Sequence, residues 1–418
     1  MNLIRTAAGA LRSLSRRPPR VYWTAARLAL GTASALGISR FAYGLLLPAM
    51  RTDLGWSLAQ AGALTTANSV GYLLGAAVAG VAARRWGSTA TFRLGMLITA
   101  VALAATAVSS AYPALLTARL AAGAGGALVF VAGGVIASRS AAAARSPAPI
   151  TIYFSGAGLG IAVSAAWLPS LATHAPHDWR MAWTGLAVCA LLATAVSWAA
   201  ARVDEPEPQL ATGRRAIRHL WRTAVAYLLF AGGYIAYVTF LSAALFQEAV
   251  PTWQVSTLWA FLGSSAMVAP PLWSPLIGAW PPARVLTTLL ALLAGASALP
   301  LVSSSYVVLA VSAVVYGGTF MTVPAAVTAT IRGATRPEDW APTLAAFTTV
   351  FAAGQTVGPW AAGTIADHTS ADATLVWAAA LCAAATLVAA TRRPQVNSRG
   401  SAGVRPLGKR ARVDLDAG

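Results

Sequence analysis

The sequence predicts an all-α integral membrane protein with twelve transmembrane helices, and its composition and hydropathy are the observations that predict it. Of its 418 residues, 57% are hydrophobic and 10% are charged, and the mean hydropathy is +0.64. A soluble domain carries about 25% charged residues. Twelve apolar segments approach the roughly 20 residues that a helix needs to cross a bilayer core of about 30 Å. A membrane β-barrel does not fit, because its strands alternate over about ten residues instead of forming unbroken apolar runs.

The N-terminal half is predicted to hold a basic tail, residues 1–20, and a six-helix bundle over 21–201. The expected spans are 21–47, 59–82, 89–110, 112–138, 149–173 and 181–201. A basic segment before an apolar run also occurs in secretory signals, and "ASA" at 33–35 could be a cleavage site. We expect no cleavage, because the apolar run continues to Leu47 and is long enough to span.

The C-terminal half is predicted to follow a cytoplasmic linker over 202–222, "RVDEPEPQLATGRRAIRHLWR", which is rich in charge and contains proline. A second bundle covers 223–391, and a basic cytoplasmic tail covers 392–418. The expected spans are 223–247, 255–280, 283–303, 305–331, 340–366 and 371–391.

The two halves share a spaced pattern, which predicts a duplicated six-helix unit. "SSAYPALLTARLAAGAGG" at 109–126 aligns with "SSSYVVLAVSAVVYGGTF" at 303–320. The aligned pairs are Tyr112 with Tyr306, Gly123 with Gly317, Tyr153 with Phe351, Gly156 with Gly354, and Gly160 with Gly358. Two such halves facing each other would enclose a cleft near the membrane midplane, and rocking them would expose it to each side in turn.

The net charge of +18 is explained by topology. If the N-terminus is cytoplasmic, 25 of the 30 basic residues fall in inward segments. This asymmetry follows the positive-inside rule, which predicts an even number of spans and two cytoplasmic termini. The basic tail around "GKRAR" at 408–412 is therefore expected to be a solvated flank, and no nucleic-acid partner is expected.

Catalytic and metal-binding motifs are not evident. Cys189 and Cys382 lie in apolar spans with no nearby histidine, so neither a disulfide nor a metal site is expected. No Ser, His and acid cluster indicates an enzyme, and no cofactor is implied. The glycines of "SGAGLG" at 155–160 lie in an apolar span without a following lysine, so they predict helix packing and bending instead of a phosphate loop.

Four segments carry a resemblance to a known family. They are "ISRFAYGLLLPAMRTDLGWSLAQAG" (38–62), "ANSVGYLLGA" (67–76), "YGGTFMTVPA" (316–325) and "FAAGQTVGPWAAGTIAD" (351–367). Over about residues 20–392 the chain resembles a major facilitator superfamily (MFS) transporter, and more narrowly the bacterial YbfB/YjiJ-type branch. The resemblance implies a multi-pass protein of the bacterial inner membrane, with spans one, four, seven and ten around a central cavity.

The loop after the second span departs from the superfamily pattern. "GVAARRWGST" at 80–89 keeps Gly80, Arg85 and Gly87, which the resemblance implicates in gating, but Arg84 stands where the family has an acid. Because that acid contributes to the inner gate, the inward face of this chain is expected to close differently or less firmly. The alternative is that Arg84 and Arg85 are topology charges alone.

Arg40 is the candidate that points most directly to a substrate. It lies six residues beyond the centre of the first span, a rise of about 9 Å, which puts its charge within the hydrocarbon. An arginine there costs about 2.5–3.5 kcal/mol on the lenient insertion scale and normally faces an aqueous cavity or a partner. None of the twelve acids lies deep in a span. The alternative is a lipid-facing arginine that snorkels to the surface.

Arg119 is predicted at the matching depth, six residues inside the outer end of the fourth span. The resemblance assigns it to the Arg-and-Gly motif of a cavity-lining helix, and its alternative role is to hold backbone carbonyls. Two cations without a buried acid suit an anion that accepts paired N–H bonds. The other substrate-binding candidates are Tyr43, Asn68, Tyr72, Tyr234, Tyr237, Tyr316 and Gln355. Each could instead hydrogen-bond neighbouring helices.

Ion coupling is left open. All four histidines fall in loops or at span ends. Glu248 and Asp367, near the outer ends of spans seven and eleven, are fallback proton sites. The sequence leaves three modes of transport open: exchange, facilitated diffusion, and symport in which the substrate carries the proton. We expect a monomer that moves a small organic anion by secondary active or facilitative transport, with coupling to protons or a counter-anion left open. An efflux pump for amphipathic drugs or metabolites is the alternative, and a receptor or embedded enzyme would need a sensor domain or a reactive cluster that the sequence lacks.

Overall fold

The computed structural model describes residues 19–144, 148–171, 178–201 and 217–391, and every regular element in these ranges is a helix. The elements are α2 (Pro19–Thr32), η1 (Ala33–Phe41), α3 (Ala42–Leu54), α4 (Leu58–Val108), α5 (Tyr112–Ala144), α6 (Ala148–Leu171), α7 (Asp178–Trp198), α8 (Trp221–Gln247), α9 (Thr252–Ala279), α10 (Pro282–Val302), α11 (Tyr306–Phe320), α12 (Val323–Ala334), α13 (Pro337–Asp367) and α14 (Asp372–Ala390).

The predicted spans all coincide with helices. Eleven helical segments among the described residues are long and apolar enough to cross a membrane. The remaining predicted span, 340–366, lies within the 31-residue helix α13. The first span is longer than the sequence predicts, because the helix does not end near Leu47 but continues to Leu54. The predicted tails and most of the predicted linker lie outside the described residues.

The first span is not a single α-helix. Residues Ala33–Phe41 form a π-helix, η1, between the α-helices α2 and α3, and all nine of its residues are buried. The backbone N–H of Ala42 donates to the carbonyl of Gly37, the i−5 pattern of a π-turn. Such turns are rare and are frequent at functional sites. Arg40 lies in the last turn of this element.

The tenth span is interrupted near its middle. Helix α11 ends at Phe320, and α12 begins at Val323 with Pro324 in its first turn. Proline has no N–H to continue the ladder of the preceding helix, so a break at this position is expected. The Thr322 side chain is fully buried at the break, and its hydroxyl has no hydrogen-bond partner. Interrupted helices commonly border the substrate site of transporters.

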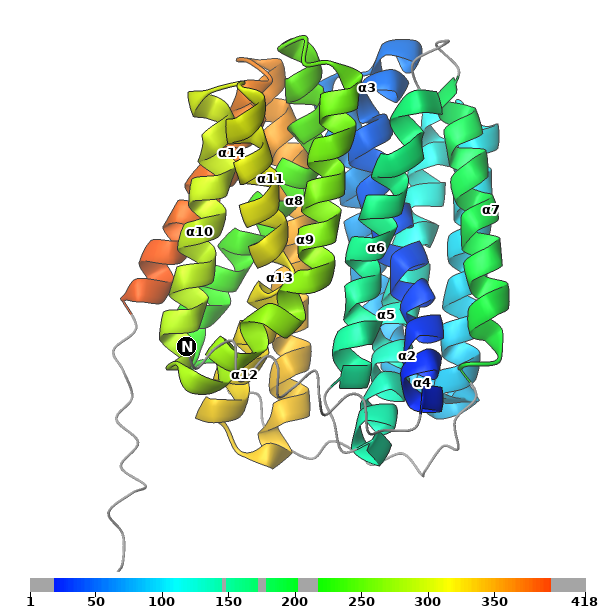
Figure 1. Ribbon diagram of the computed structural model, residues 1–418, viewed down its shortest axis with the longest axis vertical. Helices are drawn as coiled ribbons and strands as arrows, with labels where there is room; N and C mark the ends of the chain where they lie inside the picture. The colour runs from blue at the N-terminus through cyan, green and yellow to red at the C-terminus, as the bar shows by residue number, and fades with distance from the viewer. Residues whose placement is uncertain (1–18, 145–147, 172–177, 202–216, 392–418) are drawn as a thin grey trace, which may run out of the picture.

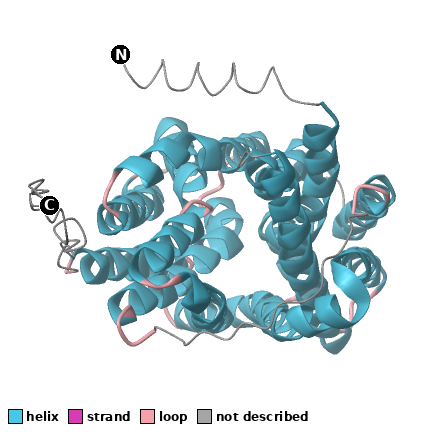
Figure 2. Ribbon diagram, turned by 90° about the horizontal axis from the view of Figure 1, so that it is seen from below, coloured by secondary structure: helices cyan, strands magenta, loops and turns pink. Residues whose placement is uncertain are grey.

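The helices form two groups that lie side by side (Figures 1 and 2). We call α2 to α7 the N-half and α8 to α14 the C-half. The halves meet where α6 packs on α9, α4 on α13, and α3 on α8. We call the end with the Gly55 turn the distal end, at the top of Figure 1, and the opposite end the basic end. The charge pattern predicts that the distal end faces outward.

Equivalent residues make equivalent contacts in the two halves. A Cβ on Gly123 would meet the carbonyl of Asn68 in α4, and one on Gly317 would meet the carbonyl of Leu262 in α9. The same holds for the second glycine pattern, in which Gly156 and Gly160 pack on the carbonyls of Ala29 and Ala33, and Gly354 and Gly358 pack on those of Leu228 and Gly232. Small residues at these crossings let the helix backbones approach closely. The repeat found in the sequence is therefore a repeat of helix packing.

The distal end is closed between the halves. The carboxylate of Asp367, at the end of α13, accepts hydrogen bonds from the backbone N–H groups of Leu58 (2.7 Å) and Ala59 (2.8 Å), at the start of α4. These donors have no partner within their own helix, and the helix dipole favours a negative charge there. Deeper in, Thr66 donates to the carbonyl of Thr356. Helices α4 and α13 thus clamp the two halves together at this end.

Candidate functional site

Arg40 lies at the boundary between the halves. Its side chain is 7% exposed, and its Nη2 donates to Oε1 of Gln355 on α13 and, over 3.3 Å, to the Ser69 hydroxyl on α4. The guanidinium carbon lies 5.5 Å from the centre of the Tyr72 ring, also on α4. The side chain is therefore directed into the protein, and the lipid-facing alternative does not hold for this structure.

Gln355 extends this contact into the C-half. Its side chain is fully buried, and its Nε2 donates to the Tyr234 hydroxyl of α8 over 2.8 Å. Arg40, Ser69, Tyr72, Tyr234 and Gln355 thus form one group, which we call the interhalf cluster. The cluster connects the π-helix of the first span to the seventh and eleventh spans through side chains alone.

The interhalf cluster leaves the charge of Arg40 uncompensated. In the part of the chain that the structure describes, the groups that contact this guanidinium are all neutral, and its buried Nε has no hydrogen-bond partner. Two of the described acids have partners elsewhere, since Asp53 accepts from the Trp179 indole and Asp367 caps α4. A buried charge is stable only when it is paired or hydrogen-bonded. Within the described residues, Arg40 therefore has neutral hydrogen-bond acceptors but no negatively charged partner.

Arg119 lies in a second group inside the N-half. Its side chain is 1% exposed, its Nη1 donates to the carbonyl of Ser39 over 2.7 Å, and its guanidinium faces the rings of Tyr43 and Trp183. Asn68 donates to the carbonyl of Arg119 itself. Arg119 is thus bound to the residue before Arg40, which agrees with the depth predicted from the sequence. The Nε and Nη2 atoms are buried without partners.

The remaining tyrosine candidates form a third group in the C-half. Tyr237 and Tyr316 stack with their ring centres 4.0 Å apart. The Tyr237 hydroxyl is bonded to that of Ser312, and the Tyr316 hydroxyl donates to the carbonyl of Tyr234. These hydroxyls are satisfied by the protein, so they hold α8 and α11 together and position the backbone that carries Tyr234.

An aromatic cluster borders Tyr234, and the sequence did not single it out. Phe351 stacks on Tyr227 and Tyr234 at 4.7 and 5.7 Å between ring centres, and Phe230 stacks on Tyr234 at 4.9 Å. Phe320, at the break in the tenth span, contacts Tyr234 at 5.9 Å. The spacing of residues 227, 230 and 234 is the signal that could have found it, because intervals of three and four place aromatic residues on one helical face.

The predicted gating residues lie at the turn between the second and third spans. Gly87 has φ +85°, which breaks the helix within α4 and is a conformation that favours glycine. Arg85 is exposed. Gly80 is partly buried in the preceding helix. The side chain of Arg84 lies outside the described residues.

Metal ligands are not gathered within the described residues. No group of three or more His, Cys, Asp or Glu side chains there could hold an ion. Cys189 is partly exposed and Cys382 is buried, and both are free thiols.

Comparison with known proteins decides the family. The family model described as "Uncharacterised MFS-type transporter YbfB" matches residues 32–392. The chain belongs to this MFS family. It is a multi-pass membrane transporter. No sequence among the curated proteins matches the chain.

Solved MFS structures share the fold. The nucleoside transporter NupG is similar with a TM-score of 0.72 and 12% identity, over 89% of this chain and 100% of that one. The human organic anion transporter MFSD10 (TETRAN) is similar with a TM-score of 0.64 and 16% identity, over 89% of this chain and 100% of that one. A D-xylose-proton symporter is similar with a TM-score of 0.66 and 12% identity, over 88% of this chain and 96% of that one. At these identities the likeness shows the MFS fold.

Proposed function

We propose that this MFS transporter moves a small organic anion by alternating access, and that Arg40 is the principal contact of the anion. The observation that carries this proposal is a buried guanidinium at the boundary of the halves whose described contacts are all neutral. A carboxylate, sulfonate or phosphate can accept two parallel N–H bonds from such a group. The bound substrate would supply the missing negative charge.

Gln355 is proposed to hold the position at Arg40 that the substrate takes on binding. Its amide oxygen accepts from Arg40, and its amide nitrogen donates to Tyr234. Charge-assisted bonds to an anion are roughly twice as strong as those to a neutral acceptor, so an arriving carboxylate competes with the amide. Displacing Gln355 would break the link between η1 and α13, which couples binding to movement of the halves.

Arg119 is proposed as a positioning residue with a secondary electrostatic role. Its bond to the carbonyl of Ser39 holds the π-turn that carries Arg40, and its positive charge adds to the attraction for an anion. Tyr43 and Asn68 support it from α3 and α4. Tyr237 and Tyr316 act similarly on the other side, by fixing the helix of Tyr234.

The orientation and coupling follow the sequence-based expectation. We propose a monomer in a bacterial inner membrane with both termini cytoplasmic, which makes the distal end the outer gate. Gly80, Arg85 and Gly87 belong to the inner gate, where the acid of the family pattern is replaced by Arg84. Proton or counter-anion coupling is part of this proposal, and a substrate that carries its own proton satisfies it without a buried acid.

The aromatic cluster favours a second candidate function. Stacked rings from α8, α11 and α13 beside Tyr234 offer an apolar, polarizable wall. Efflux of amphipathic drugs or metabolites would use this wall and would not need Arg40. The two functions therefore differ in their dependence on the charge.

Replacing Gln355 with glutamate tests the anion proposal. Gln355→Glu puts a carboxylate against Arg40. It is therefore expected to raise the thermal stability of the purified protein and to prevent anions from binding at Arg40. In the unchanged protein, an anion at a hundredfold excess over its Kd should stabilise by about 2.7 kcal/mol. Thermal-shift measurements with a panel of carboxylates, sulfonates and neutral amphiphiles would record both effects.

Gln247→Glu, at an exposed glutamine of α8, is the matched control and should respond to the panel as the unchanged protein does. If Gln355→Glu retains full stabilisation by the same anions, Arg40 is not their contact. If only neutral amphiphiles stabilise the protein, the efflux function is supported instead.

Removing the carboxylate of Asp367 is expected to loosen the distal gate. Asp367→Asn weakens the cap on α4, an interaction of about 0.5–1 kcal/mol, so the open fraction should rise about twofold to fivefold. Spin labels on cysteines at Val108 and Val302, two exposed residues at the distal ends of α4 and α10, would report longer distances in a background without Cys189 and Cys382. Asp372→Asn, at an exposed carboxylate of the same end, should leave the distances unchanged. Equal distributions of the distance between the spin labels in both variants would mean that Asp367 does not hold the distal gate closed.

A further inference from the structure

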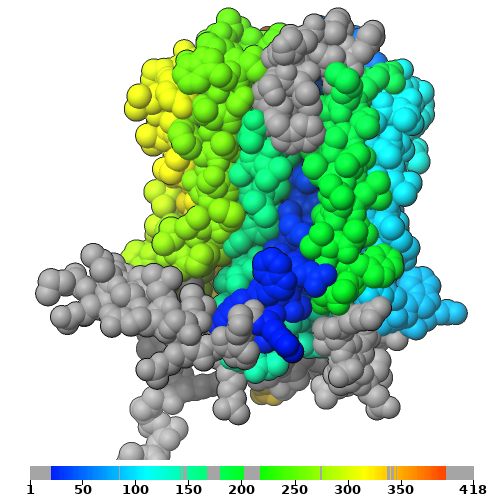
Figure 3. All heavy atoms as spheres, turned by 45° about the vertical axis from the view of Figure 1, so that its right-hand side comes forward, coloured from blue at the N-terminus to red at the C-terminus, as the bar shows by residue number. Residues whose placement is uncertain are grey.

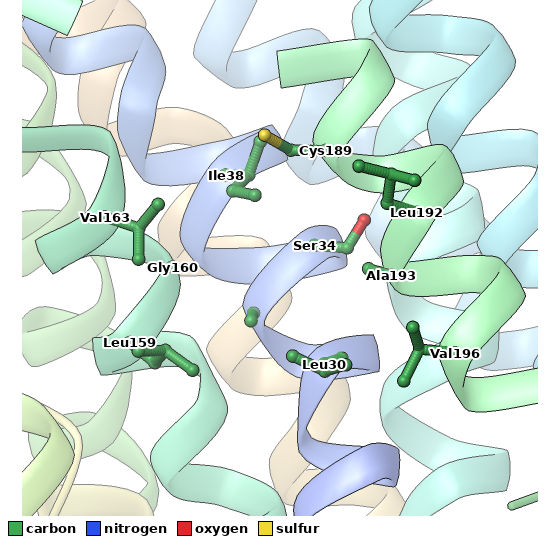
Figure 4. Close-up of a pocket in the computed structure, with 11 residues that line it drawn as sticks. Leu30, Ser34, Ile38, Leu159, Gly160, Val163, Cys189, Leu192, Ala193 and Val196 are labelled. Atoms are coloured by element: carbon green, nitrogen blue, oxygen red, sulfur yellow. The ribbon is translucent and has the colours of Figure 1, made fainter. Parts of the chain in front are cut away.

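We propose that a separate cavity in the N-half binds a small lipophilic molecule with one hydroxyl group, of the phenol or alcohol class, which enters from the bilayer. The cavity lies between the first span, α6 and α7, and it has a volume of about 260 Å³ (Figure 4). Its lining includes Ser34 and Ile38 of η1, Leu159 and Val163 of α6, and Leu192 of α7. Neither proposed transport function involves these residues.

The size and lining of the cavity favour an apolar guest. An engineered cavity of about 150 Å³ lined by aliphatic and aromatic side chains stays dry and binds benzene. The present cavity is larger, and apart from Ser34 and Cys189 its lining consists of Leu, Ile, Val, Ala and Gly. No charged side chain lines it, so an anion suited to Arg40 would find no counter-charge here. The cavity and the interhalf cluster therefore take different ligands.

The guest would come from the membrane. Val163, Leu192 and Val196 line the cavity and are also 41%, 61% and 44% exposed on the apolar outer face of the helices. Figure 3 shows the first span at the surface between α6 and α7. Towards the basic end the gap is closed, because Nε of Arg27 donates to the carbonyl of Val196 over 2.9 Å. The opening thus faces the hydrocarbon of the bilayer, and the closed end faces the polar surface.

Ser34 determines the polar part of the ligand. This serine is fully buried, and its hydroxyl has no hydrogen-bond partner in the structure. In Figure 4 the hydroxyl projects from η1 toward α7. An unpaired buried hydroxyl is costly, and one neutral bond recovers part of that cost. Because the hydroxyl is closed off in this structure, a ligand reaches it when the Ser34 side chain turns toward the cavity. A ligand with one hydroxyl then satisfies Ser34, whereas a pure hydrocarbon leaves it unpaired.

Photoaffinity labelling of the full-length protein in phosphatidylcholine nanodiscs tests the proposal. The two probes are a phenol that carries a trifluoromethyl-diazirine and its analogue with a methyl group in place of the hydroxyl. We expect saturable labelling of peptides from η1 and α7, and about fivefold to tenfold weaker binding of the methyl analogue, which is the loss of one neutral hydrogen bond. Ser34→Ala should weaken binding of the phenol probe to the level seen with the methyl analogue.

Two leucine substitutions on α7 separate the cavity from the general lipid surface. Ala193 lines the cavity, so Ala193→Leu fills it and should abolish saturable labelling by both probes. Ala195 is exposed and does not line the cavity, so Ala195→Leu should label like the unchanged protein. The proposal is overturned if labelling rises linearly with probe concentration, if Ala193→Leu labels like Ala195→Leu, or if Ser34→Ala keeps the phenol preference. None of these outcomes depends on transport.

Discussion

Arg40→Gln is expected to lower anion transport by about 30-fold or more in proteoliposomes. Removing one partner of a buried, hydrogen-bonded charge pair costs about 2–5 kcal/mol, and each 1.4 kcal/mol is a factor of ten in affinity. Arg40→Lys keeps the charge but loses the planar fork that binds a carboxylate through two bonds, so it should recover only part of the transport. Initial uptake rates of the anions found by thermal shift are the measurement.

Arg222→Gln is the matched control for Arg40. Like Arg40, this arginine donates to a neutral acceptor, here the backbone carbonyl of Thr391, but it lies at the exposed basic end. Its substitution should leave uptake within about twofold of the unchanged protein, because exposed charges contribute little. Unaltered anion uptake in Arg40→Gln, with monodisperse protein, would remove the anion proposal. Continued efflux of neutral amphiphiles by the same variant would support the second function.

Gly123→Val is expected to cause a large loss of stability in the N-half. A Cβ at this position would meet the backbone of Asn68 and Tyr72 in α4, which cannot move as a side chain can. Forcing volume into a packed interface costs about 1–3 kcal/mol. The same shift would weaken the bond between Asn68 and Arg119. Thermal unfolding in detergent, followed by tryptophan fluorescence, would record the loss.

Gly134→Val on the same helix is the control for Gly123. Among the described residues, the one atom within 4 Å of its added Cβ belongs to the Phe154 ring, at 3.7 Å, an ordinary contact distance. Its stability should stay close to that of the unchanged protein. Comparable losses in both variants would show that valine propensity in the helix, and not the crossing of α4 and α5, decides the effect.

The helices were predictable because membrane burial acts on composition, which is visible in the sequence. The lengths of the apolar runs predicted the spans, and the aligned glycines predicted the repeat. In the structure, Gly123 and Gly317 lie at equivalent helix crossings of the two halves. The same signals cannot report a change of register inside an apolar run. A π-turn at Ala33–Phe41 and a break after Phe320 leave hydropathy unaltered, so the sequence predicted plain helices there.

The candidate site was predictable residue by residue but not as a set of contacts. Arg40 and Gln355 are conspicuous as polar groups in apolar spans, yet 315 positions separate them, and nothing local indicates that they meet. Ser69 was missed because a serine in an apolar helix usually bonds its own backbone. The nine substrate-binding candidates fall into three groups, and only four of them, Arg40, Tyr72, Tyr234 and Gln355, belong to the interhalf cluster.

The π-turn in the first span also provides a route for motion. A π-turn closes its hydrogen bond one residue further along the chain than an α-turn does, so η1 holds surplus chain between two regular segments. Passing that surplus along the chain, toward Pro19 or toward Gly55, would rotate the intervening side chains by about 100° around the axis. Arg40 sits at the end of the stored turn, and such a slip would swing its guanidinium away from Gln355 without unwinding the helix. The first span could therefore rotate locally about its axis while still supporting the bundle.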